Sequence, residues 1–219
     1  MPLSKEIIEA LTAESSKRRA RLLSAKRNQL ALWLGRLVIA FNDLEYSLAR
    51  EISSGLSLRV DPIKANQRYY LPYDSDMVDI MMASASFGQK LDFFSALFLK
   101  RFDGNDKQQE HIKSVITALS NAEGFRNQYI HSVWIEPTLS ENFSRRKAKT
   151  KGRKGLKISD ETANVDSIKT AIKDINFLQT YGIYSVANEK ISARIGTNHF
   201  LTISKNFKPT EADSRRLRL

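Results

Sequence analysis

Three polar side chains stand close together in the apolar segment FRNQYIHSVW, residues 125–134. Arg126 carries a permanently charged guanidinium, Asn127 an amide, and His131 an imidazole that titrates near neutral pH. Asn127 and His131 are about one helical turn apart, so a helix places them along one line. Arg126 lies about 140° around the helix from His131, where its long side chain can reach back to the histidine or toward another helix.

An arginine and a histidine acting without a metal suit the cleavage of RNA by its own 2′-hydroxyl group. The histidine moves a proton, and the arginine stabilises the charge that grows on the phosphorane. The amide of Asn127 can orient the imidazole or bind a phosphate oxygen. The reaction needs both a base and an acid. A two-fold dimer would supply a second His131, although water or a lysine could also serve.

Other catalytic chemistries have less support in the sequence. The chain has 219 residues, no cysteine and three histidines, of which His111 and His199 stand alone. A disulfide framework, a thiolate metal site and a cysteine nucleophile are therefore excluded, and metal-dependent hydrolysis is poorly supported. No nucleotide-binding glycine pattern and no nucleophile elbow is present. We expect neither a metal nor another cofactor.

The charge balance indicates an acidic partner, and nucleic acid is the commonest such partner. The net charge is +11, with six Lys and Arg but no acid over residues 16–27 and eight over residues 143–157. The second run follows the motif closely and can clamp an RNA backbone, although a charge run is also compatible with a solvated hairpin or loop. The candidate RNA-binding residues are Arg145, Arg146, Lys147, Lys149, Lys151, Arg153 and Lys154.

Helical periodicity dominates the chain. Residues 4–53 read as helix, with a candidate break at 24–28 and an end at Gly55. Further helices are expected over residues 76–102 and 106–131, joined by the turn FDGND. The buried stripe of the first helix is expected to be Leu30, Trp33, Leu34, Leu37, Val38, Phe41, Leu44, Leu48 and Ile52. In the second helix, Val78, Ile80, Met81, Phe87, Leu91, Phe94, Leu97 and Phe98 are expected to be buried.

The pattern changes after the motif. SVWIEP, residues 132–137, predicts a strand, and residues 142–152 its basic hairpin partner. Helix returns at about 164–186. We therefore predict an all-α, up-and-down bundle of four to five helices with a short basic β-hairpin inserted before the last helix. The expected organisation is a basic N-terminal helix (1–27), a helical domain (28–187) and a loosely docked C-terminal tail (188–219).

The segment RNQYIH, Arg126–His131, resembles the motif of HEPN domains (higher eukaryotes and prokaryotes nucleotide-binding). Those domains carry an arginine, then Asn, Asp or His, and a histidine a few residues later. The order of elements is also similar: the helix with FNDLEYSLAREI, the helix with SFGQKLDFFSAL, the motif helix, a basic hairpin and a closing helix. The similarity spans about residues 28–187.

The resemblance implies a metal-independent RNA endonuclease whose site forms at a homodimer interface. Arg126 and His131 would be catalytic, Asn127 would support them, and the products would carry 2′,3′-cyclic phosphate and 5′-hydroxyl ends. Members of the family often act as toxins or antiviral effectors, sometimes restrained by an antitoxin. Others lack nuclease activity and bind RNA, a nucleotide or a protein.

Two structural alternatives remain open for the motif. His131 can simply cap helix carbonyls, and Arg126 can pair with Glu45 or Glu123, of which we favour Glu45 as a hypothesis. The N-terminal residues lack the apolar core of a signal peptide, and the most apolar run, residues 30–41, is interrupted by Arg36. We therefore expect a cytoplasmic protein without a membrane span.

Overall fold

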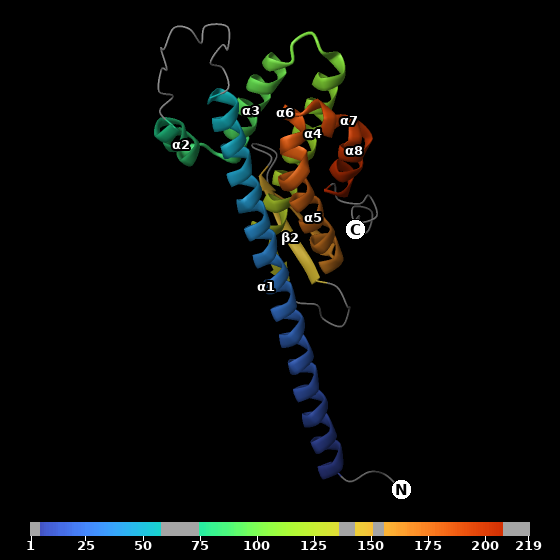
Figure 1. Ribbon diagram of the computed structural model, residues 1–219. Coiled ribbons are helices and arrows are strands. Elements are labelled where there is room, and N and C mark those ends of the chain that lie inside the picture. Colours follow the sequence, from blue (N-terminus) through green and yellow to red (C-terminus); the bar gives the residue numbers. More distant parts are fainter. Residues whose placement is uncertain (1–4, 58–74, 136–142, 151–155, 208–219) are drawn as a thin grey trace, which may run out of the picture.

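A computed structural model describes residues 5–57, 75–135, 143–150 and 156–207. These residues form a helical bundle with a small antiparallel sheet, which confirms the expected all-α fold (Figure 1). The helices are α1 (Lys5–Ser57), α2 (Ser75–Ser84), α3 (Phe87–Arg101), α4 (Asp106–Ile130), α5 (Val165–Phe177), the π-helical segment η3 (Leu178–Gly182), α6 (Ile183–Ala187), α7 (Glu189–Ile195) and α8 (Thr197–Asn206). The strands are β1 (Val133–Ile135), β2 (Phe143–Thr150) and β3 (Leu156–Ala163). None of the described helices is long and apolar enough to cross a membrane.

Helix α1 is continuous, so the candidate break at residues 24–28 is wrong. That segment, SAKRN, contains neither glycine nor proline, and its alanine, lysine and arginine favour helix. Gly55 does not end the helix but lies within its last turn. With 53 residues α1 is about 80 Å long, and its N-terminal part projects beyond the bundle (Figure 1).

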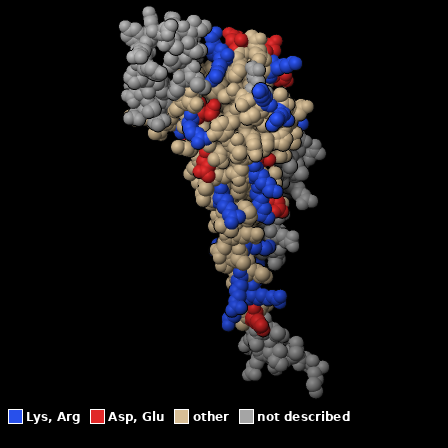
Figure 2. Space-filling model, in the orientation of Figure 1, with Lys and Arg blue, Asp and Glu red and all other residues tan. Residues whose placement is uncertain are grey.

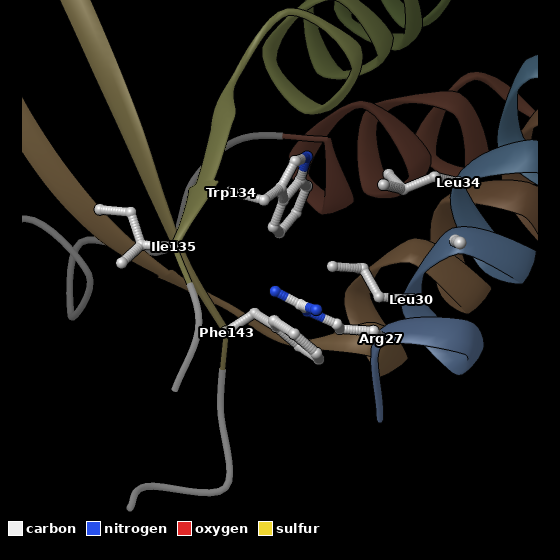
Figure 3. Close-up of a pocket in the computed structure, with 7 residues that line it drawn as sticks. Arg27, Leu30, Leu34, Trp134, Ile135 and Phe143 are labelled. Carbon is white, nitrogen blue, oxygen red and sulfur yellow. The ribbon is translucent and has the colours of Figure 1, made fainter. Parts of the chain in front are cut away.

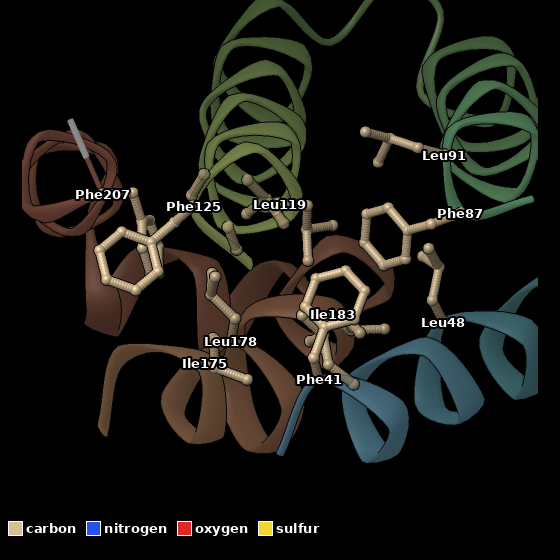
Figure 4. Close-up of a cluster of buried hydrophobic side chains, with 14 of the residues drawn as sticks. Phe41, Leu48, Phe87, Leu91, Leu119, Phe125, Ile175, Leu178, Ile183 and Phe207 are labelled. Atoms are coloured by element: carbon tan, nitrogen blue, oxygen red, sulfur yellow. The ribbon is translucent and has the colours of Figure 1, made fainter. Parts of the chain in front are cut away.

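The predicted stripe of α1 forms one wall of the core. Leu37, Phe41 and Leu44 are fully buried, whereas Val38 at the edge of the stripe is exposed. The Phe41 ring lies 4.7 Å from the ring of Phe87 on α3, measured between centroids. Figure 4 shows how α1, α3, α4 and the C-terminal helices contribute apolar side chains to this continuous core.

The single helix expected over residues 76–102 is two helices. Ser86 caps α3 by accepting a hydrogen bond from the backbone of Gln89, whose side chain accepts one from the backbone of Ser86. This reciprocal capping box starts a new helix and changes its direction. As a result Ile80 and Met81 are exposed, while Met82 is buried. Val78 has no described side-chain environment.

Helix α4 matches its predicted bounds. The side chain of Asn105 caps its first turn, and Gly104, with φ of +85°, provides the left-handed residue that the preceding turn needs. His131 is the C-terminal cap.

The predicted hairpin is part of a three-stranded antiparallel sheet with the order β1-β2-β3. The pairing of β1 with β2 confirms the hairpin, and β3 adds a third strand to it. The register places Trp134, Arg145 and Glu161 side by side across the three strands.

The expectation of a loosely docked tail after residue 188 is wrong for residues 188–207. Helices α7 and α8 occupy this segment, and α8 packs against α4. Phe200, Ile203 and Phe207 are buried in the core. These three apolar side chains have the three- and four-residue spacing of one helix face, and they complete the core because α4 presents them with an apolar face. Residues 208–219 lie outside the described part.

Candidate functional site

The motif lies at the C-terminal end of α4, where the helix leads into β1. The backbone N–H of His131 donates to the carbonyl of Asn127 at 3.1 Å, which places these residues on successive turns. The His131 side chain is exposed, whereas Arg126 and Asn127 are half-buried. An imidazole open to solvent is accessible to a substrate.

Arg126 is held by two neighbours. Its Nη1 donates to Oδ1 of Asn127 at 2.7 Å, and its guanidinium carbon lies 4.5 Å from the centre of the Phe41 ring on α1. A guanidinium over an aromatic face gains a cation–π interaction. The side chain therefore reaches toward α1, the second of the two directions that the sequence allowed.

The structure pairs Glu45 with Lys90 rather than with Arg126, so the proposed Glu45–Arg126 ion pair is wrong. Lys90 is buried on α3, which makes the nearby carboxylate its necessary counter-charge. Burial raises the pKa of Glu123, the Arg126 guanidinium opposes that shift, and the Glu45 carboxylate adds to it. Arg126 thus interacts with the charge of Glu123 without forming a direct ion pair with any of the described residues.

The structure joins Arg126 to Asn127 through side chains and Asn127 to His131 through the backbone. Among the residues it describes, none donates to or accepts from the His131 imidazole. The arrangement offers a proton-transfer group in solvent next to an amide and a fixed positive charge. Such a set can bind a phosphate and move one proton, but within one protomer it presents one imidazole.

Arg145 does not lie on the surface as the RNA-clamp prediction requires. Its side chain is 4% exposed, Nη2 pairs with Glu161 on β3, and Nη2 also donates to Gln128 at 3.3 Å. Its guanidinium lies 4.5 Å from the centre of the Tyr129 ring. On a β-strand, side chains two residues apart point to the same face. Arg145 therefore points inward with the buried Phe143, toward the end of α4.

The other candidate RNA-binding residues divide into three groups. Arg146 is exposed and faces away from Arg145, as strand alternation requires. Lys147 and Lys149 belong to β2 without a described side-chain environment, and the remaining three lie outside the described residues: Lys151, Arg153 and Lys154.

A small cavity next to the motif was not predicted from the sequence. It has a volume of about 190 Å³ and lies between α1 and the sheet (Figure 3). Its lining is largely apolar, with one cation, and consists of Arg27, Leu30, Ala31, Leu34, Trp134, Ile135 and Phe143. The sequence does place one aromatic residue, Trp134 or Phe143, on each of the two predicted hairpin strands. Their contact with α1 is tertiary, so the sequence pattern could not predict the cavity.

The described residues contain no group of three or more His, Cys, Asp or Glu side chains that could hold a metal ion. His111 is buried and bonds Ser185 through Nε2 at 2.7 Å, and burial lowers its pKa. It belongs to a buried polar network that joins α4 to α6, away from the motif.

Comparisons of the chain with protein-family models, curated proteins and solved structures found no match.

Proposed function

We propose that this protein is a metal-independent RNA endonuclease of the HEPN type. The observation that carries the proposal is the solvent-exposed imidazole of His131 at the end of α4, next to the linked Arg126 and Asn127. The 2′-hydroxyl of the substrate would attack the adjacent phosphorus, forming the 2′-O–P bond while the P–O5′ bond breaks. A base takes the 2′-hydroxyl proton, and an acid delivers a proton to the departing 5′ oxygen.

The two proton transfers motivate a homodimer. One imidazole cannot begin the reaction both deprotonated and protonated, so a second His131 from a partner copy would complete the site. Arg126 would stabilise the phosphorane charge, and Asn127 would hold Arg126 in place through its amide oxygen. By the family resemblance, the activity would serve as a toxin or an antiviral effector in the cytoplasm, restrained by an antitoxin or another defence partner.

A second candidate is a non-catalytic HEPN-like module that binds RNA, a nucleotide or a protein partner. The packing of Arg126 on Phe41 and its charge interaction with Glu123 favour it, because they give the guanidinium a structural role. Binding of RNA without cleavage would then be the whole activity.

Incubation of the purified protein with total RNA in EDTA separates these candidates. We expect fragments with cyclic phosphate and 5′-hydroxyl ends from the wild type and none from His131→Ala. His199→Ala is the matched control, because His199 is also exposed but lies on α8. Intact RNA with the wild type, or equal cutting by His131→Ala, would rule out the proposed site.

A further inference from the structure

The cavity beside the motif has the composition of a base-binding pocket. Leu30 and Phe143 are buried walls, and Trp134 and Ile135 are half-buried. Single-stranded RNA is commonly held by bases stacked on aromatic side chains or on arginine guanidinium planes. Figure 3 shows the Arg27 side chain reaching from α1 toward Phe143 and Trp134, so both kinds of stacking surface border this space.

The Trp134 ring is already fixed in position. Its indole N–H donates to the carbonyl of Tyr129 at 3.2 Å, and its ring lies 5.8 Å from the Tyr129 ring, measured between centroids. A fixed aromatic wall loses little conformational freedom when a ligand binds, which favours binding. The volume of about 190 Å³ suits one single-ring base, since a cavity of about 150 Å³ holds benzene.

The charge around the cavity complements the backbone that a base carries. Arg27 ends the basic run of α1, and Lys and Arg side chains follow the projecting part of that helix (Figure 2). Phosphates flanking an inserted base would meet these cations, whereas an apolar protein segment would gain nothing from them.

The cavity is also close to the motif along the chain. Trp134 follows His131 by three residues, so their Cα atoms are at most about 11 Å apart. A base held against Trp134 would keep the adjoining stretch of its strand near His131.

We propose that the cavity between α1 and strands β1 and β2 binds one unstacked base, of pyrimidine size, from a single-stranded RNA. This assignment rests on the proposed function, whose substrate it names as single-stranded RNA with a base inserted beside the scissile region. Arg27 contributes stacking surface and positive charge, and Trp134 and Phe143 contribute the aromatic walls.

The test fills the cavity without disturbing the core. Ala31 is exposed on α1 and lines the cavity, so Ala31→Leu places a side chain there while keeping a strong helix former. Ala25→Leu is the matched control, because Ala25 is an exposed alanine of the same helix outside the lining. Each variant is made in a Trp33→Phe, His131→Ala background, in which Trp134 is the one remaining tryptophan and cleavage is blocked.

Oligouridine and an abasic ribose-phosphate oligomer of equal length are titrated in EDTA while Trp134 fluorescence is followed. We expect oligouridine to quench Trp134 and to bind about tenfold more weakly to Ala31→Leu than to Ala25→Leu, as loss of one stacked base predicts. The abasic oligomer should neither quench nor distinguish the two variants. Absence of quenching, or equal affinity of both variants for oligouridine, would refute the base-binding assignment, as expected if the cavity instead receives an apolar side chain of a protein.

A cleavage assay on the histidine-intact protein separates this proposal from the nuclease proposal. Base-dependent quenching by a protein that never cuts RNA would support the pocket and refute the nuclease. If the protein cuts RNA, Ala31→Leu does not change the cutting, and oligouridine does not quench Trp134, the nuclease proposal is supported and the base-binding pocket is refuted.

Discussion

The pair Arg145–Glu161 provides the most direct test of how the basic segment works, because the sequence predicts an RNA contact where the structure has a buried ion pair. Removal of the carboxylate by Glu161→Ala leaves a guanidinium that is 4% exposed. Its Nε and Nη1 have no hydrogen-bond partner in the described structure, and Nη2 would retain only the 3.3 Å bond to Gln128. The Tyr129 ring beneath the guanidinium cannot replace a full counter-charge.

Breaking a buried ion pair from one side costs about 3–5 kcal/mol, because an uncompensated charge stays buried. For a domain of this size that corresponds to a fall of about 6–20 °C in the unfolding temperature. The double variant Arg145→Met with Glu161→Ala removes both charges and keeps an unbranched apolar stem over Tyr129. It should therefore recover most of the loss.

Urea unfolding followed by circular dichroism measures these differences as shifts in the midpoint at constant slope. Asp103→Ala is the matched control, since it breaks the exposed pair Lys100–Asp103 and should change stability by less than about 1 kcal/mol. A loss below about 1 kcal/mol for Glu161→Ala, or a double variant no more stable than the single one, would refute the structural role of the pair.

The same variants test the RNA contact that the sequence predicted. Arg145→Met with Glu161→Ala should leave the slope of binding affinity against salt concentration unchanged, because a buried guanidinium releases no counterions from RNA. If the double variant lowers this slope by the amount expected for about one released counterion, Arg145 contacts a phosphate and the buried assignment is refuted.

Three further predictions concern the packing of the helical bundle. Glu45→Gln should destabilise the fold by about 3 kcal/mol because it leaves Lys90 buried without its counter-charge, and Lys90→Met in that background should restore stability in thermal unfolding. Gly55→Ala should be less stable than Gly35→Ala by about 1–3 kcal/mol in urea, because an added Cβ meets a side-chain carbon of α3 at 2.7 Å at the first site and open space at the second. Burial lowers the pKa of His111, so the unfolded chain takes up that proton at a higher pH than the folded chain. The free energy of unfolding should therefore fall as the pH drops below about 6.5, and His111→Gln should remove that part of the pH dependence; an unchanged profile would contradict it.

The local sequence determined the buried face of α1, the bounds of α4 and where the polar motif lies. The threefold and fourfold spacing from Leu37 to Leu48 fixed the buried face of α1, because an apolar stripe on a helix must be covered. The FDGND turn likewise fixed the start of α4, and its apolar pattern fixed its end at His131. These features depend on neighbours within one or two turns, which is why pattern alone predicted them.

Tertiary structure decided what each polar side chain contacts. Arg126 packs on Phe41, Lys90 takes the carboxylate of Glu45, and Arg145 turns inward to Glu161. Each of the first two contacts joins residues at least 45 positions apart in the chain, and the third depends on which face of β2 meets α4. Residue spacing along the chain cannot predict these contacts, because the energy of a charged side chain depends on its burial and on partners that only folding brings near.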